Sequence, residues 1–242
     1  MQEPMKMMNQ YPNSPKLWAV IPAAGSGRRF SATDLKQYQV ILGQTVLEHS
    51  VQALNHLPLA GYVLALGAED DFAATLQLST RSLAHFCLGG AERVDSVLNA
   101  LNYLMKMADP EDWVLVHDAA RPCVAPLNLD GLLHTAIDTA HSAILATPVR
   151  DTLKHVGADH AITHTVSREQ LWQAQTPQIS KLGLLKHALE TALADGVSVT
   201  DEASALEYIS APVQVVLGRS DNIKITYPED LTLAELILQS RK

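Results

Sequence analysis

The stretch Leu17-Trp18-Ala19-Val20-Ile21-Pro22-Ala23-Ala24-Gly25-Ser26-Gly27-Arg28-Arg29 decides the fold of this chain. Its apolar first part, Leu17 to Ile21, predicts a buried strand, and the small residues after it predict a loop. Glycine and alanine let backbone N–H groups approach a ligand closely, which is how such loops bind phosphate groups. Two arginines end the stretch, and Lys36 follows. The pattern therefore predicts a site for a nucleoside triphosphate at the end of a strand.

Two common phosphate-binding loops do not match this spacing. A P-loop needs four residues between its glycines and then Gly-Lys-Ser/Thr, which the segment lacks. The dinucleotide-binding fingerprint needs a third glycine three residues after the second, and Phe30 occupies that position. An oxidoreductase is therefore disfavoured. For the loop taken alone, a plain strand-to-helix turn is the alternative interpretation.

Length, charge and composition favour a single domain. The chain has 242 residues, enough to bury a substantial core, and a formal net charge of -8. This charge, with no basic stripe, argues against nucleic acid as the main partner. The two cysteines, Cys87 and Cys123, have no metal-ligand spacing, and neither CxxC nor HExxH occurs. We interpret them as thiols in a reducing compartment.

The ends of the chain suggest a tail followed by one domain. Residues 1–16 are rich in Met, Asn, Gln and Pro and predict a disordered N-terminal tail, not a signal peptide. We expect residues 17–242 to form one domain. No segment reaches the roughly 18 apolar residues of a membrane helix. We therefore expect a cytoplasmic protein with no membrane partner.

Short apolar runs alternate with helical patterns along most of the chain. Further buried strands are predicted at Tyr62–Leu66, Trp113–Val116, Ala143–Ala146 and Val213–Leu217. A capping box from Thr45 to Glu48 predicts a helix start, and apolar residues at helical spacing recur at Val94–Met105 and Leu182–Leu189. Pro228 fits the first turn of a last helix. The alternation predicts an α/β fold, a Rossmann-like, mostly parallel sheet with helices on both faces. Ligands of such sheets bind at the carboxyl ends of the strands, where the glycine loop would lie.

One region, about 147–175, breaks this alternation. Its β-branched residues on either side of Gly157-Ala158-Asp159 suggest a hairpin. Because a hairpin that cannot bury both faces usually packs on something else, we expect a β-arm that protrudes from the α/β domain, plausibly onto a second subunit. An ordinary long surface loop is the alternative.

A set of motifs, in order along the chain, is similar to that of a known enzyme family. Besides the glycine loop and Lys36-Gln37-Tyr38, the chain contains Gly89-Gly90-Ala91-Glu92-Arg93 with Ser96, Val116-His117-Asp118-Ala119-Ala120-Arg121-Pro122, Pro148-Val149-Arg150-Asp151-Thr152, Thr176-Pro177-Gln178, Thr200-Asp201-Glu202-Ala203-Ser204 and Asp221-Asn222-Ile223-Lys224-Ile225-Thr226. From about residue 17 to 238, the chain resembles the 2-C-methyl-D-erythritol 4-phosphate cytidylyltransferases of the non-mevalonate isoprenoid pathway.

The resemblance implies a reaction in which CTP and a polyol phosphate give a CDP-alcohol and pyrophosphate. The attacking phosphate is largely dianionic at neutral pH, because its second pKa is near 6, and it needs no general base. Catalysis should then consist of positioning and charge neutralisation. Arg29 and Lys36 would stabilise charge on the α-phosphate and the pyrophosphate. The resemblance also implies a Mg²⁺ ion between phosphates, with Asp118 as its ligand and Asp221 as a weaker second candidate.

The resemblance assigns the remaining site residues by position. The nucleotide would be bound by Pro22, Ala23, Ala24, Gly25, Gly27, Gly90, Ala91, Ser96 and Asp118. The methylerythritol phosphate would be bound by Asp118, Arg121, Thr152, Arg168, Thr200 and Lys224, of which Arg168 and Lys224 would hold its phosphate for attack. Thr152 and Arg168 lie on the expected arm. If the arms interlock in a homodimer, they would enter the partner's active site.

Three points are left open by the sequence. The family usually has Asp where this chain has Ala91, so the selection of the base is in question. It also usually has Pro where this chain has Leu35. Thr200 or Asp201 could simply cap a helix that begins there. A ribitol 5-phosphate cytidylyltransferase and a non-catalytic nucleotide-binding protein are the alternative functions.

Overall fold

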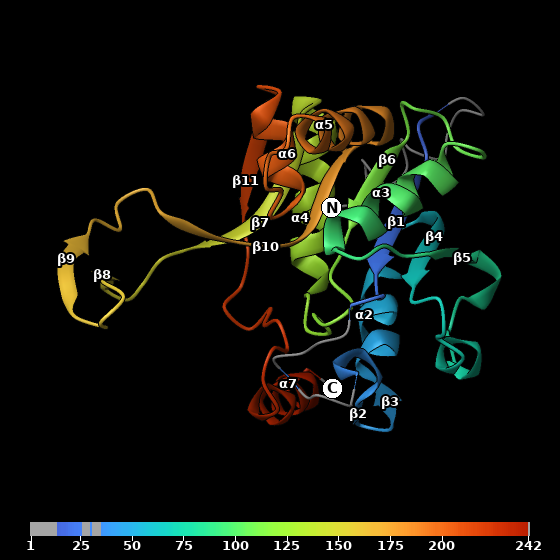
Figure 1. The fold of residues 1–242 in the computed structure, drawn as a ribbon. Helices are drawn as coiled ribbons and strands as arrows, with labels where there is room; N and C mark the ends of the chain where they lie inside the picture. The colour runs from blue at the N-terminus through green and yellow to red at the C-terminus, as the bar shows by residue number, and fades with distance from the viewer. Residues whose placement is uncertain (1–13, 26–29, 31–34, 242) are drawn as a thin grey trace.

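A seven-stranded sheet forms the centre of the molecule (Figure 1). The computed structural model describes residues 14–25, 30 and 35–241. In spatial order the strands are β11 (Val213–Leu217), β7 (Ser142–Pro148), β10 (Trp172–Lys181), β6 (Trp113–Val116), β1 (Leu17–Pro22), β4 (Leu59–Leu66) and β5 (Ala84–Leu88). Every neighbouring pair is parallel except those of β10, which runs antiparallel to β6 and β7.

Alternation of side chains along β1 builds a core on each face of this sheet. Leu17, Ala19 and Ile21 belong to one buried cluster, and Trp18 and Val20 belong to the other. The first cluster is completed by helices α2 (Val46–Leu54) and α4 (Pro126–Thr139), and the second by α3 (Arg93–Leu104), α5 (Leu182–Ala194) and α6 (Glu202–Tyr208). The predicted α/β fold, with a mostly parallel sheet and helices on both faces, is confirmed.

The predicted elements match the structure closely where the signal was local. β6 and β11 have the predicted bounds, while β4 and β7 extend beyond theirs. The capping box of α2 is present, because Thr45 Oγ1 accepts from the Glu48 backbone N–H while Glu48 Oε2 accepts from the Thr45 backbone N–H. The sequence analysis did not identify β5, α4 or the antiparallel strand β10.

A smaller unit lies below the sheet in Figure 1, where α7 (Glu229–Gln239) packs beside the short strands β2 (Val40–Ile41) and β3 (Gln44–Thr45). A third buried cluster holds it together, with Ile41, Val46, Cys123, Ile225 and Ala234 among its members. Helix α7 begins directly after Pro228, as predicted. The segment of three residues before β2, Lys36–Tyr38, is a 3₁₀ helix.

A hairpin formed by β8 (Leu153–Val156) and β9 (Ile162–Val166) extends away from the rest of the molecule in Figure 1. Its strands pair around the predicted Gly157-Ala158-Asp159 turn, and almost all side chains from Arg150 to Gln173 are exposed. The expected range 147–175 includes more chain than the hairpin. Thr147 and Pro148 pair with Gln173 and Trp172 as the ends of β7 and β10.

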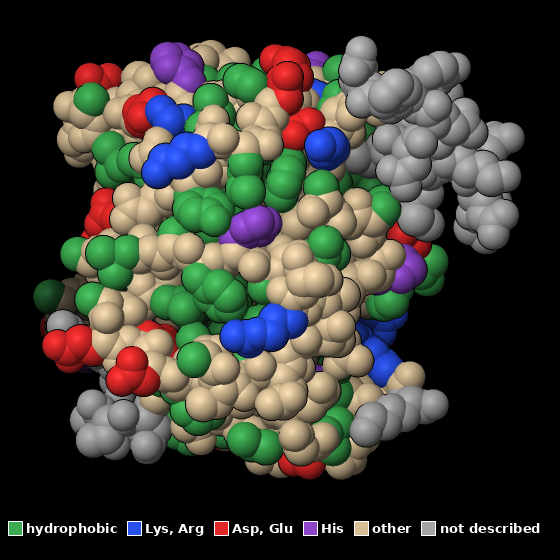
Figure 2. All heavy atoms as spheres, turned by 90° about the vertical axis from the view of Figure 1, so that its right-hand side faces the viewer, with side chains coloured by type: hydrophobic (Ala, Val, Ile, Leu, Met, Phe, Trp, Pro, Cys, Tyr) green, Lys and Arg blue, Asp and Glu red, His purple; other side chains and the backbone are tan. Residues whose placement is uncertain are grey.

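Three further points concern the edge of the sheet, the two thiols and the ends of the chain. The β5 edge of the sheet faces the viewer in Figure 2, where hydrophobic side chains interrupt the polar surface and Phe86 and Leu88 are exposed.

Cys87 and Cys123 are free thiols. Within the described residues, no helix is both long enough and apolar enough to cross a bilayer. Of the expected tail, residues 1–13 lie outside the described part.

Candidate active site

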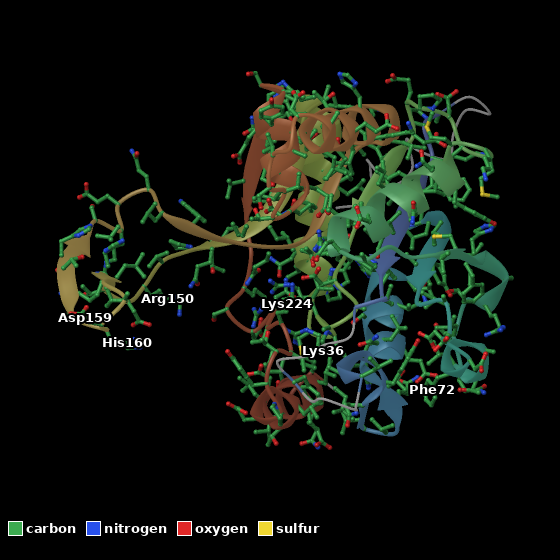
Figure 3. All side chains as sticks on the ribbon, viewed as in Figure 1. Lys36, Phe72, Arg150, Asp159, His160 and Lys224 are labelled. Atoms are coloured by element: carbon green, nitrogen blue, oxygen red, sulfur yellow. The ribbon has the colours of Figure 1, made fainter. Side chains whose placement is uncertain are left out.

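A cavity of about 470 Å³ opens at the carboxyl ends of β1, β5 and β6. The sequence predicted a ligand site at this edge of the sheet. Predicted site residues that line it are Pro22, Ala23, Gly25, Lys36, Gly90, Ala91, Ser96, Asp118 and Lys224. Figure 3 shows Lys36 and Lys224 near one another between the sheet and α7, and shows Asp159 and His160 far out at the tip of the hairpin, with Arg150 on the segment that leads to it. Gly27 and Arg29 lie outside the described residues.

The start of the glycine loop is fixed by hydrogen bonds to its backbone. The Ala23 N–H donates to the Ala65 carbonyl oxygen at 2.8 Å, which continues the β1–β4 pairing beyond the strand. The Gln37 side chain is buried and donates from Nε2 to the Ala23 carbonyl oxygen at 2.8 Å and to that of Gly25 at 3.4 Å. Lys36 Nζ donates to the Ile225 carbonyl oxygen at 2.9 Å. Gln37 was missed in the site prediction, although it stands beside Lys36 in a quoted motif.

The second wall of the cavity is the turn between β5 and α3. A Cβ atom on Gly90 would lie 2.2 Å from Asp95 Cβ, and one on Gly89 would lie 2.4 Å from Ala24 Cβ. The turn therefore requires glycine at both positions. Ser96 Oγ accepts from the Gly90 N–H at 3.0 Å and donates to the Glu92 carbonyl oxygen at 3.2 Å. Ala24 thus packs against this turn instead of lining the cavity, while the exposed Ala91 lies at the cavity's rim.

Asp118, the second residue after β6, is surrounded by three cations. Oδ1 accepts from Arg93 Nε at 2.9 Å, and Oδ2 accepts from Lys224 Nζ at 2.8 Å and Arg121 Nε at 3.4 Å. Burial would raise the pKa of the Asp118 carboxyl, but the charges of Arg93, Lys224 and Arg121 overcome this effect and hold the pKa well below its usual range. Asp118 is therefore ionised throughout the physiological pH range.

Two residues that the prediction did not select, Arg93 and Glu202, complete this cluster. Arg93 Nη1 and Nη2 donate to the two carboxylate oxygens of Glu202 at 2.7 and 3.1 Å. Burial alone would lower the pKa of the Arg93 guanidinium, and the carboxylates of Glu202 and Asp118 more than offset it. Both residues stand inside quoted motifs. Only the long-range pairing, across 109 positions of sequence, distinguishes them from ordinary helix-start charges.

His117 lies beside this cluster as a neutral hydrogen-bonding group. Its Nε2 donates to the Arg121 carbonyl oxygen at 3.0 Å, so its Nδ1 accepts from Thr176 Oγ1 at 3.1 Å. Thr176 Oγ1 in turn accepts from the Asp118 N–H at 3.0 Å. Burial lowers the pKa of the His117 imidazole to about 4. His117 is therefore a structural group, held by hydrogen bonds at both ring nitrogens.

Six of the predicted site residues that the structure describes do not line the cavity of this protomer: Ala24, Arg121, Thr152, Arg168, Thr200 and Asp221. Thr152 and Arg168 are exposed beside the hairpin, and Thr200 is exposed before α6. Asp201, not Thr200, supplies the side-chain cap of α6, since its Oδ1 accepts from the Ser204 N–H at 3.0 Å. Asp221 faces Arg219 and Arg241 instead of Asp118, and hydrogen bonds from Arg219 lower its pKa to about 2 although burial opposes them.

Asp118 is the predicted metal ligand that lines this cavity, and its two oxygens contact Arg93, Lys224 and Arg121. In the described ranges, no group of three or more His, Cys, Asp or Glu side chains is arranged to hold a metal ion. Mg²⁺ in nucleotide sites is commonly held by one or two carboxylates together with substrate phosphates, and this donor set has that character. Asp221 does not line the cavity, so it does not add to this donor set.

Comparison with known proteins gives one consistent answer. Residues 17–240 match the family IspD: 2-C-methyl-D-erythritol 4-phosphate cytidylyltransferase. A protein of that name from Acinetobacter baumannii (strain AYE) is 64% identical over 237 residues, covering 98% of this chain and 100% of the relative. The crystal structure of the Francisella tularensis protein of that name is similar with a TM-score of 0.79 at 34% identity, covering 92% of this chain and 99% of that one. A 4-diphosphocytidyl-2C-methyl-D-erythritol synthase gives a TM-score of 0.80 at 36% identity, covering 93% and 99%.

Proposed function

The chain belongs to the 2-C-methyl-D-erythritol 4-phosphate cytidylyltransferase family, and we propose that its cavity at the ends of β1, β5 and β6 is the site of that family's reaction. The protein is a nucleotidyltransferase that converts CTP and 2-C-methyl-D-erythritol 4-phosphate to 4-diphosphocytidyl-2-C-methyl-D-erythritol and pyrophosphate. The observation that carries the site assignment is the meeting of two glycine turns with Lys36, Lys224 and the cations around Asp118 in one cavity.

The chemistry of the site suits the attack of one anion on another. The substrate phosphate is already a nucleophile at neutral pH, so the protein has no proton to remove from it. His117 supports this view, because it is buried, neutral and hydrogen-bonded at both ring nitrogens. The remaining task is to bring two anions together in line. Preorganised cations and backbone donors do this without reorganisation during the reaction.

We assign the nucleotide to the side of the cavity with the glycine turns. Pro22, Ala23 and Gly25 would face the triphosphate, with Lys36 and, outside the described residues, Gly27 and Arg29 neutralising its charge. Gly90, Ala91 and Ser96 would bind the cytidine, and at Ala91 that contact would use the backbone. When bound, Mg²⁺ would supply further charge neutralisation, with Asp118 as its protein ligand.

We assign the acceptor phosphate to the opposite side, where Lys224 and Arg121 meet Asp118. Thr152, Arg168 and Thr200 do not reach this place within one protomer. Apolar side chains exposed on and beside the hairpin (Val156, Ile162, Leu171 and Trp172) support a homodimer in which each arm packs on the other subunit. Arg168 and Thr152 would then complete the partner's site. Cytoplasmic location stays a prediction from the sequence.

The test is pyrophosphate release from CTP in the presence of Mg²⁺, with methylerythritol phosphate and ribitol 5-phosphate offered in parallel. We expect turnover with methylerythritol phosphate alone. Lys36→Ala should reduce kcat/KM by about 100-fold or more, the typical effect of removing one preorganised donor. Lys106→Ala, at an exposed position outside the cavity, is the matched control. Turnover with ribitol 5-phosphate alone would reassign the acceptor, and CTP binding without pyrophosphate release would favour a binding protein.

A further inference from the structure

A chain of charged side chains runs beneath the cavity and joins three parts of the fold. Glu202, the first residue of α6, pairs with Arg93, the first residue of α3. Arg93 pairs with Asp118 after β6, and Asp118 pairs with Lys224. The function proposed above uses Asp118 and Lys224 but gives Glu202 no role. Its side chain is 3% exposed, whereas that of Arg93 is 28% exposed and lines the cavity.

The shape of the guanidinium explains what Glu202 does to Arg93. A guanidinium presents its donors in a rigid fork, and two of its N–H groups can bind one carboxylate side by side. Glu202 occupies the Nη1 and Nη2 donors at 2.7 and 3.1 Å. Each of these nitrogens uses one N–H toward Glu202, and Nε is the donor that contacts Asp118, at 2.9 Å to Oδ1. Arg93 therefore takes one oxygen of Asp118 and leaves the other.

The other oxygen of Asp118, Oδ2, lies on the side of the cavity that we assign to the acceptor phosphate. Asp118 Oδ2 accepts from Lys224 Nζ at 2.8 Å and from Arg121 Nε at 3.4 Å. We propose that Glu202 is a positioning residue for the transfer reaction, which acts by holding Arg93 so that Asp118 Oδ2 is reserved for Lys224 and Arg121. The inference rests on the proposed function, in which these two cations bind the acceptor phosphate.

Loss of the Glu202 charge should therefore disturb one substrate more than the other. Without a second carboxylate, the Arg93 fork can take both oxygens of Asp118, which removes the contact that orients Lys224. The acceptor phosphate would then meet a displaced lysine, while the glycine turns that face the nucleotide keep their own hydrogen bonds. If Glu202 only stabilised the fold, Glu202→Gln would lower the unfolding temperature and leave both KM values unchanged.

The experiment compares Glu202→Gln with Glu207→Gln, the same change at an exposed position of the same helix. Pyrophosphate release is measured while CTP and methylerythritol phosphate are varied separately, and thermal unfolding is followed in parallel. For Glu202→Gln we expect KM for methylerythritol phosphate to rise about fivefold or more and kcat to fall about tenfold, with KM for CTP changed less than about twofold. Glu207→Gln should match the wild type in all three.

A double-mutant cycle tests whether the effect passes through the guanidinium. Lys at position 93 cannot bind two carboxylates as a fork, so in an Arg93→Lys background Glu202→Gln should add less than about a twofold change. Multiplicative effects would contradict the proposal, as would an altered unfolding temperature with unchanged KM and kcat. If Glu202→Gln does not fold, Glu202→Asp keeps the charge with a shorter reach and must still raise the acceptor KM selectively. Absence of turnover in the wild type would instead refute the proposed function.

Discussion

At the scale of single residues, His117 has a different role from the one its residue type suggests. A histidine beside an aspartate in a cavity is a common acid–base arrangement. Here Nε2 of the ring donates to the Arg121 carbonyl oxygen, and Nδ1 accepts from the Thr176 hydroxyl. The oxygen of that hydroxyl accepts from the backbone N–H of Asp118. The imidazole thus fixes the loop that carries Asp118 and takes no part in proton transfer.

The same burial makes His117 a source of acid sensitivity. Its folded-state pKa of about 4 lies below the value near 6.5 in an unfolded chain, so the unfolded state binds the proton more readily. The full contribution of the neutral imidazole to the free energy of unfolding is present above about pH 6.5, and it is lost as the pH falls toward 4. The pKa difference corresponds to about 3 kcal/mol of unfolding free energy.

Urea unfolding of the metal-free protein at several pH values measures this effect. His117→Gln removes the titrating group, so its unfolding free energy should fall less steeply between pH 6.5 and 4 than that of the wild type. The slopes are compared, because the variant also loses hydrogen bonds at neutral pH. Parallel slopes would show that His117 is not the group responsible. Asp118 contributes a further loss only below its own unfolded-state pKa, near 4, because its folded-state pKa is depressed.

At the scale of elements, the turn before α3 depends on the absence of a side chain. In Gly90→Ala the new Cβ would meet Asp95 Cβ at 2.2 Å and the Asp95 backbone carbon at 3.1 Å. Asp95 also caps α3 by accepting from the Glu92 N–H, so the turn and the helix start would both shift. We expect KM for CTP to rise about tenfold, the size of effect that misplaced binding groups cause.

Gly131→Ala is the matched control for this substitution. Gly131 lies within α4, and the nearest atom to an added Cβ is Val216 Cγ1 at an ordinary 3.7 Å. Alanine in a helix interior is favoured over glycine by about 0.5–1 kcal/mol, so this variant should be as stable as the wild type or more so. Equal KM values for CTP in the two variants would contradict the assignment of the turn to the nucleotide.

The start of α6 separates a capping role from a substrate role. Asp201→Ala removes the acceptor for the Ser204 N–H and for Gln178 Nε2, and should lower the unfolding free energy by about 0.5–2 kcal/mol. Thr200→Ala, at an exposed position, should change it by less than about 0.5 kcal/mol. If Thr200 also contacts the acceptor, as the family resemblance implies, Thr200→Ala should raise KM for methylerythritol phosphate. If that KM is unchanged, Thr200 has no contact with the acceptor.

The elements that could be predicted were those whose signal is local. The apolar runs of β6 and β11 and the capping box of α2 are written in a few adjacent residues. β10 could not be found this way, because its first three residues are exposed and a register shift between Gln175 and Gln178 interrupts its pairing with β7. Thr176, which lies in this interruption, contacts His117 and Asp118.

At the scale of the whole molecule, motif residues that are distant in sequence meet only through topology. The parallel order of β5, β4, β1 and β6 places the ends of these strands along one edge, so the glycine turns and Asp118 share a cavity. Sequence analysis could place each motif at a strand end. It could not pair Glu202 with Arg93 or separate Asp221 from Asp118, because those contacts depend on how α6 and α7 pack.

The hairpin raises the last question, whether one protomer contains a complete active site. Thr152 and Arg168 lie beside a hairpin whose side chains are almost all exposed, while Lys36 and Lys224 line the cavity of the body. If arms are exchanged in a homodimer, Arg168→Ala disables the partner's site and Lys36→Ala disables its own. Each variant alone should then have little activity.

Mixing the two variants tests the exchange directly. Half of the dimers formed by subunit exchange at equal amounts contain one of each chain, and one of their two sites combines an intact Lys36 with an intact Arg168. Because one site in two is intact in half of the dimers, a C2 dimer with shared sites should recover about 25% of the wild-type activity. If each arm served its own subunit, both variants would stay inactive in the mixture. A mixture with Lys106→Ala in place of Lys36→Ala controls for the exchange procedure, because every dimer then keeps Lys36 and only the arms differ.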